Sequence, residues 1–186
     1  MPDRFRIPPL VSVMARYGVL SGVLGIVAAM VFYYIGKHPF WLFPFFDPRV
    51  LLIIIFLVFG LKEIRDYMQG GVLYFWQALG GSLVLLVVMS IVGYAGIWII
   101  TAIEPGFLSA YIEQGLEQIK AIPAENADEI GVAAMEEVRR TLPETTVSWM
   151  AKRYAVQTYL FGFFIAVIIS VVLRRHPQTP ETDGIS

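Results

Sequence analysis

Few residues in this sequence could carry chemistry, and the most conspicuous is Glu104, within the stretch ITAIEPGF (residues 100–107). A carboxylate deep in a lipid bilayer is costly, and such residues commonly serve as proton or cation sites. Glu104, however, ends a long apolar run and directly precedes Pro105. The sequence therefore favours a boundary carboxylate at the water interface, with a proton or cation site as the alternative.

Metal, thiol and phosphate chemistry find little support in the residue types. The chain has no cysteine, and its two histidines, His38 and His176, lack a histidine or carboxylate at i+3 or i+4. No glycine-rich phosphate loop, G-x-S-x-G or H-E-x-x-H pattern occurs. Glu63, Arg65 and Asp66 form a charged group that fits either lipid headgroups or a solvated helix end. We therefore expect no metal, no cofactor and no enzymatic activity.

Composition places these residues in a membrane protein. Of the 186 residues, 57% are hydrophobic and 16% are charged, and the mean hydropathy is +0.67. Soluble domains carry roughly 25% charged residues. A net charge of −1 gives no electrostatic case for binding nucleic acid. The basic N-terminus leads into an apolar run of span length without a small-residue cleavage site, which predicts an uncleaved signal-anchor.

The apolar runs predict an all-α integral membrane protein with four transmembrane helices and an amphipathic helical hairpin between the third and the fourth. An N-terminal segment (residues 1–16) precedes the membrane domain (17–175), and a disordered polar tail (176–186) follows it. The predicted spans cover residues 17–35, 49–67, 74–103 and 154–173. Asp47 and Pro48 are typical of a helix start, and the Gly70–Gly71 pair is typical of a helix end. We expect no Asp, Glu, Lys or Arg to be buried midway along a span.

Glycines recur along two of the predicted spans. Gly18, Gly22 and Gly25 lie within two turns of the first span, and Gly93 and Gly96 lie in the third. Small residues let the backbones of membrane helices approach closely. We therefore take these five glycines as candidates for helix packing, the alternative being glycines that are incidental to a membrane helix.

The segment from residue 105 to residue 143 is predicted to be an extramembrane hairpin of two amphipathic helices. Each helix repeats apolar residues with a helical period. In the first they are Leu108, Ile112, Leu116 and Ile119, and in the second they are Ile130, Ala134, Val138 and Leu142. Glutamates occupy the other side, and the stretch IPAEN breaks the two helices, with Asn126 and Glu129 as a possible capping box. We expect both apolar faces to be covered.

The distribution of lysine and arginine predicts the orientation, because these residues favour the cytoplasmic side. Four spans put both termini on one side, which carries seven such residues. The hairpin side also carries seven lysine and arginine residues. Three of them lie at the edge of the stretch of about 15–20 residues next to a span in which such charges influence orientation. The four that lie closer to a span are Lys37, Arg49, Lys152 and Arg153. The termini are therefore predicted to be cytoplasmic and the hairpin external.

The order of these features resembles the bacterial membrane family catalogued as domain of unknown function 4199. The resemblance rests on RYGVLSG at the entry of the first span, GGVLYFWQALGGS at the opening of the third, IEPGFLSAYIEQ at the beginning of the acidic helical loop and YLFGFFIAVIISVVLRR in the last span. It covers roughly residues 16 to 175. It implies a four-span architecture and brings no activity and no catalytic residues to transfer.

We expect a non-enzymatic accessory or scaffold protein of the bacterial inner membrane, active in envelope biogenesis. Its partners would be the lipid bilayer and either another membrane protein or a second copy of itself. The alternative is a small permease or lipid-handling protein. A closed, packed bundle favours the first function, and a polar cavity reaching mid-membrane favours the second. Two carboxylates converging at one interface would instead favour a membrane enzyme.

Overall fold

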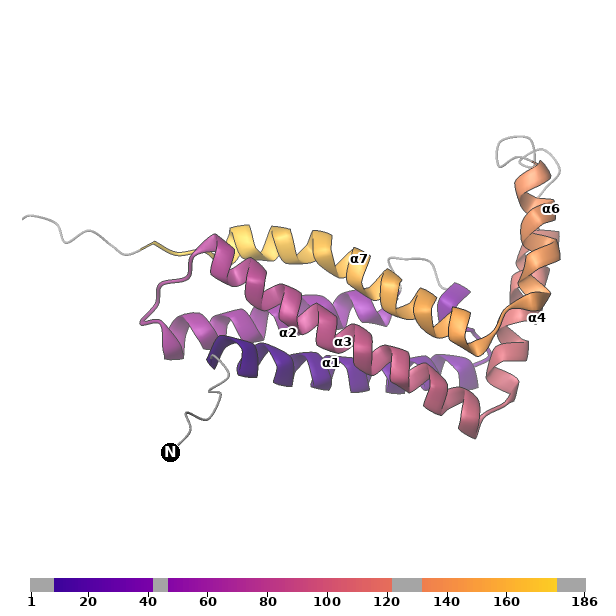
Figure 1. Cartoon of the computed structure of the whole chain (residues 1–186), viewed down its shortest axis with the longest axis horizontal. Coiled ribbons are helices and arrows are strands. Elements are labelled where there is room, and N and C mark those ends of the chain that lie inside the picture. Colours follow the sequence, from indigo (N-terminus) through magenta and orange to yellow (C-terminus); the bar gives the residue numbers. More distant parts are fainter. Residues whose placement is uncertain (1–8, 42–46, 122–131, 177–186) are drawn as a thin grey trace, which may run out of the picture.

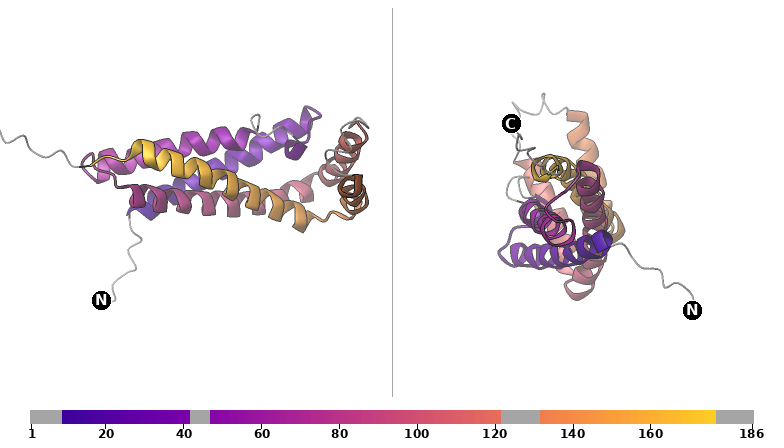
Figure 2. Two further views of the ribbon diagram at one scale, coloured as in Figure 1. Left: turned by 90° about the horizontal axis from the view of Figure 1, so that it is seen from above. Right: turned by 90° about the vertical axis from the view of Figure 1, so that its left-hand side faces the viewer.

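The computed structural model describes residues 9–41, 47–121 and 132–176, which are almost entirely helical. The longer helices are α1 (Pro9–Tyr34), α2 (Pro48–Glu63), α3 (Phe75–Ile103) and α7 (Val147–Leu173). They lie side by side along one axis, as Figures 1 and 2 show. Two shorter helices, α4 (Gly106–Lys120) and α6 (Val132–Thr141), lie across one end of this bundle, which we call the capped end.

Three short elements complete the fold. The 3-10 helix η1 (Pro39–Trp41) lies between α1 and α2, and η4 (Leu142–Glu144) connects α6 to α7. A π-helical turn, η3 (Ile64–Met68), extends α2. At the end opposite the cap, the backbones of Leu73 and Arg175 pair through two hydrogen bonds of 2.9 and 2.8 Å.

Within the described residues, three helices are long and apolar enough to cross a membrane, namely α1, α3 and α7. At 1.5 Å per residue their lengths are about 39, 44 and 41 Å, against a hydrocarbon core of about 30 Å. Three of the four predicted spans are therefore confirmed as candidate spans. Helix α2 has 16 residues and is shorter than these three helices, because it begins partway along the bundle, directly after its cap Asp47.

Two helices begin earlier than predicted. Helix α1 begins at Pro9 instead of residue 17, since Pro is accommodated in a first helical turn and Val13 and Met14 are buried against the other helices. Helix α7 begins at Val147 instead of residue 154. The side chain of Thr146 accepts a hydrogen bond from the backbone N–H of Trp149 at 3.2 Å and so caps this start.

The helix boundaries that depend on local signals are confirmed. The side chain of Asp47 accepts a hydrogen bond from the backbone N–H of Arg49 at 2.9 Å, and Pro48 is the first residue of α2. After η3, Gly70 and Gly71 adopt φ values of +59° and +88°, a left-handed conformation that glycine adopts easily. Helix α3 ends at Ile103, directly before Glu104.

The bundle has two apolar cores. The core at the end opposite the cap joins all four helices around Met14, Leu57, Leu86 and Ala166. The core at the capped end contains Phe40, Phe107, Tyr111, Met150 and Tyr154. Helix α4 therefore packs on the bundle through its own aromatic residues.

The two capping helices differ in how well their predicted apolar faces are covered. On α4 the predicted residues Leu108, Ile112, Leu116 and Ile119 are partly buried against the core of the capped end. On α6 the chain itself covers the predicted face only in part: Ala134 is exposed, the side chain of Val138 is 43% exposed, and Leu142, just beyond α6, is buried. Coverage of this face by the membrane surface stays a prediction. The predicted helix break, its capping residues Asn126 and Glu129, and Ile130 lie outside the described residues, as does most of the predicted tail, residues 177–186.

Candidate functional site

An ion pair is buried inside the bundle, where α2 begins. Asp47 and Arg49 are each only 8% exposed. The Nε atom of Arg49 donates to both carboxylate oxygens of Asp47, at 2.9 and 2.8 Å, and its Nη2 atom donates to Oδ2. The carboxylate also accepts the backbone N–H of Arg49. The fork of the guanidinium and the start of the helix thus hold the same carboxylate.

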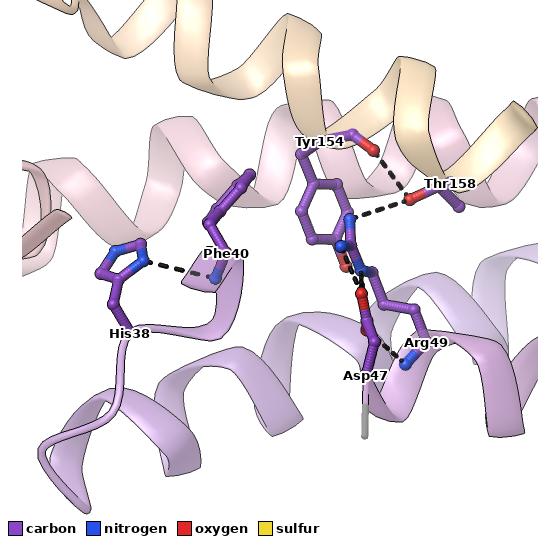
Figure 3. Close-up of polar contacts among 6 residues, drawn as sticks. All are labelled: His38, Phe40, Asp47, Arg49, Tyr154 and Thr158. Atoms are coloured by element: carbon purple, nitrogen blue, oxygen red, sulfur yellow. Dashed lines mark hydrogen bonds and ion pairs between the residues drawn. The ribbon is translucent and has the colours of Figure 1, made fainter. Parts of the chain in front are cut away.

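Helix α7 and η1 supply the walls around this pair, as Figure 3 shows. The guanidinium carbon of Arg49 lies 4.5 Å from the ring centre of Tyr154 and 5.8 Å from that of Phe40. The Nη1 atom of Arg49 reaches the hydroxyl of Thr158 at 3.5 Å, and this hydroxyl donates to the backbone carbonyl of Tyr154 at 2.8 Å. The cation is therefore held by one carboxylate, one hydroxyl and two aromatic rings.

The depth of the pair follows from the position of Thr158 in α7. Thr158 lies four residues after Tyr154, where the apolar stretch Tyr154–Leu173 begins, so it is about 6 Å inside that stretch at 1.5 Å per residue. The prediction concerned charges buried midway along a span, whereas this pair is buried at the start of the second predicted span. Ionisable residues at such depth mark functional or structurally demanding sites.

The geometry of the pair favours a structural role over proton transfer. The donors of the guanidinium are directed to the carboxylate, to the hydroxyl of Thr158 and towards two aromatic rings, which all belong to the protein itself. The pair thus fixes the first turn of α2 against α7. Sequence reasoning identified Asp47 as a helix cap and counted Arg49 as a charge near the membrane surface. The spacing Asp-Pro-Arg is the only local sequence feature that indicates the ion pair, since its partner Thr158 lies 109 residues further along the chain than Arg49.

A second polar group lies at the capped end, around Arg153 of α7. Its guanidinium carbon lies 5.4, 5.6 and 5.9 Å from the ring centres of Trp149, Trp41 and Tyr111. Its Nη1 atom donates to the hydroxyl of Tyr111 at 2.5 Å. The indole N–H of Trp41 donates to the backbone carbonyl of Tyr111 at 2.9 Å, and the two rings stack. These contacts attach α4 to η1 and to the start of α7.

His38 contributes to this attachment and shows no ligand geometry. Its backbone N–H donates to the side chain of Gln114 on α4 at 2.8 Å, and its ring packs 4.5 Å from that of Phe107. Burial lowers the pKa of His38 from 6.5 to about 4, so the ring is neutral at pH 7. Among the described residues, no group of three histidine, aspartate or glutamate side chains could hold a metal ion.

Glu104 lies apart from both groups. It follows the last residue of α3, its backbone N–H donates to the carbonyl of Ile100 at 2.8 Å, and its carboxylate accepts a long 3.4 Å hydrogen bond from the hydroxyl of Tyr34. Glu63, from the predicted charged group, accepts hydrogen bonds from Arg16 at 2.7 Å and from Tyr17 at 2.6 Å. Arg65 and Asp66 pair with each other at 2.6 Å. The charges of this group thus pair with α1 and with each other.

The five glycine candidates lie where neighbouring atoms leave no room for a side chain. A methyl group at Gly18 would lie 2.7 Å from the carbonyl oxygen of Leu85, and one at Gly22 would lie 2.8 Å from Val92, both on α3. A methyl group at Gly96 would overlap the side chain of Ile26 on α1. A methyl group at Gly93 would overlap the ring of Tyr154, and one at Gly25 would lie 3.0 Å from the hydroxyl of that same residue.

The helices that are able to cross a membrane, together with the cap at one end, define a multi-pass α-helical membrane protein. The chain belongs to the family described as protein of unknown function (DUF4199), which matches residues 16–175. This match confirms the family that the sequence motifs resemble. No curated protein and no solved structure matches the chain.

Proposed function

We propose that this chain is a non-enzymatic accessory protein of the bacterial inner membrane that holds a partner protein of the cell envelope at its capped end. The observation that carries this proposal is the exposed apolar side of α6. This helix has ten residues, and helices this short are marginal in water unless an apolar side is covered. Ala134 and Val138 are nevertheless exposed.

The chemistry of α6 suits a protein partner with both apolar and charged groups. Glu136 and Arg139, and likewise Glu137 and Arg140, form exposed i,i+3 pairs at 3.7 and 3.2 Å. Charges of both signs therefore flank Val138, which favours a partner surface with an apolar centre and a mixed polar rim. A strongly charged partner would gain little from such a helix.

The packing of the bundle supports an accessory role over the alternative of a permease. A permease needs a polar path between its helices, usually lined by broken helices or unpaired charges. Here the glycine contacts bring α1 and α3 together without a gap, and the buried charges of α2 pair with each other. The described cavities lie at the ends or on the sides of the bundle.

We include in this proposal a fourth crossing of the membrane, by α2 and η3. Together they have 21 residues and a length of about 31 to 32 Å if helical, close to the thickness of the hydrocarbon core. The termini are proposed to be cytoplasmic. The distribution of lysine and arginine supports this orientation, because seven of these residues lie on the side of the termini and only four lie close to the span ends on the side of the cap.

Photo-crosslinking in cells tests the partner. A photoreactive residue at Val138 should give an adduct with another protein, whereas one at Glu117, an exposed position of α4 at the same end, should not. An adduct at twice the 20.9 kDa mass of the chain would indicate self-association instead. If Val138 gives no adduct although the variant is expressed, α6 does not hold a partner.

Cysteine labelling tests the orientation, and the chain's lack of native cysteine makes it direct. Single cysteines at Ser12 and Thr179 should resist a membrane-impermeant maleimide in intact cells, while one at Glu125 should react. The reverse pattern would invert the orientation. Reaction at only one of the two termini, Ser12 or Thr179, would contradict an even number of crossings.

A further inference from the structure

A cavity of about 390 Å³ opens at the capped end, between α4, α6, η4 and the first turns of α7. Its walls combine aromatic side chains with a few polar groups. They include Trp41, Tyr111, Trp149, Thr145, Glu144 and Arg153. A cavity with this mixture of large apolar surface and few polar groups is typical of a site for a small ligand.

One side of the cavity suits an anion. Arg153 has five N–H donors, and it directs one of them to the hydroxyl of Tyr111. Among the described residues, no carboxylate lies within 4 Å of its guanidinium. The first turn of α7 also borders the cavity, and there the cap by Thr146 engages only the N–H of Trp149. Both features favour a phosphate group, which binds to arginine and to helix starts.

A second charged side chain of the cavity suits a cation. Glu144 lines the cavity, and its side chain forms no ion pair with a described residue. A ligand with phosphate alone would satisfy Arg153 but would meet the charge of Glu144. A ligand with one phosphate and one ammonium group matches both charges.

The location of the cavity points to a lipid as the source of these groups. It borders the start of α7, one of the helices that are able to cross a membrane, and the exposed Trp149 lies on its rim. Tryptophan is enriched at the level of lipid headgroups. We propose that this cavity binds the headgroup of a zwitterionic phospholipid with a primary amine, with the phosphate at Arg153 and the ammonium at Glu144. Val138 of α6 also lines this cavity, but the two proposed contacts, Arg153 on α7 and Glu144 in η4, lie outside α6.

The test is lipid titration of the purified full chain in detergent, followed by native mass spectrometry. Phosphatidylethanolamine, phosphatidylglycerol and phosphatidylcholine with identical acyl chains are compared. The first should bind several-fold more tightly than the other two, since only its amine can donate hydrogen bonds to Glu144. Arg153→Gln should weaken its binding about tenfold, the expected effect of losing one charged hydrogen bond. Lys152→Gln removes the neighbouring exposed charge outside the cavity and should change nothing.

Two further variants separate ligand binding from folding, because Arg153 also holds α4 in place through Tyr111. Thr145→Asp leaves these contacts intact and adds a second carboxylate to the lining of the cavity, so it should weaken binding of the phosphate group as Arg153→Gln does. Glu144→Gln should abolish the preference for phosphatidylethanolamine over phosphatidylcholine while the latter binds as before.

Three results would overturn the proposal. The first is equal binding of the three lipids by the unmodified chain. The second is an equal loss of binding in Lys152→Gln and Arg153→Gln, which would indicate nonspecific attraction. The third is binding of soluble phosphoethanolamine as tight as that of the lipid, which would make a free phosphate compound the occupant.

Discussion

The buried pair of Asp47 and Arg49 predicts a pronounced asymmetry between single and double substitutions. Asp47→Asn removes the negative charge but retains a residue that caps a helix well, so its effect reports on the pair and not on the cap. Arg49→Met removes the positive charge with little change in side-chain length. The double variant removes both charges and retains the cap.

The expected change in the free energy of unfolding follows from the burial of Asp47 and Arg49. Both side chains are about nine-tenths buried, and removing one partner of such a pair typically costs 3–5 kcal/mol, because the other charge stays buried without a partner. In the double variant no charge remains, so we expect a loss of only about 1 kcal/mol, from the 3.5 Å contact with Thr158 and the contact with the ring of Tyr154. The stability loss of the double variant should therefore be several kcal/mol smaller than the sum of the losses of the two single variants, and this difference is the coupling energy of the pair.

The assay is unfolding in mixed micelles by increasing fractions of denaturing detergent, followed by tryptophan emission. An exposed pair serves as the control: Arg140→Gln disrupts its contact with Glu137 on α6 and should cost less than about 0.5 kcal/mol. If the effects of the two single substitutions simply add in the double variant, or if each single effect is as small as that of the control, the pair is not a buried, mutually dependent unit.

Three further predictions follow from other parts of the structure. Stability should fall as the pH drops from about 6.5 towards 4, by up to about 3 kcal/mol, because the unfolded chain protonates His38 while burial lowers its pKa in the folded chain to about 4. Thermal unfolding at both pH values should show this loss, and His38→Phe should reduce it. Gly96→Ala should cost about 1–3 kcal/mol through overlap with Ile26, whereas Gly80→Ala, which meets open space, should be neutral or stabilising in the same assay. Glu104→Gln should leave expression and unfolding near those of the unmodified chain, and a loss of cellular function at normal expression would contradict a boundary role.

The parts of the fold that sequence reasoning predicted well depend on local chemistry. Helix α3 ends at Ile103 because Pro105 cannot continue it, and the start of α2 follows from the Asp47–Pro48 pair. The side of α4 that faces the bundle follows from its period, since Leu108 and Ile112 lie next to the buried Phe107 and Tyr111. Each of these features requires only residues within one or two helical turns.

The parts that sequence reasoning missed depend on distant partners. The burial of Arg49 requires Tyr154 and Thr158 on α7, and no local pattern around Arg49 identifies them. The period of α6 predicts an apolar side but does not indicate whether this chain covers it, and Val138 is in fact exposed. The residues of the cavity at Arg153 come from η1, α4, α6, η4 and α7, so their proximity is a property of the fold alone.

Tyr154 links two sets of residues that the sequence presents separately, the glycines of the helices and the charges of the pair. Its hydroxyl lies close to Gly25 on α1 and its ring lies against Gly93 on α3, so the ring fits between the helices because neither residue has a side chain. The ring also lies 4.5 Å from the guanidinium of Arg49 and covers it. A paired charge in an apolar interior is stable only while its partners remain in place. Gly25 and Gly93 therefore do more than permit close helix packing, because they position the aromatic ring that shields the start of α2.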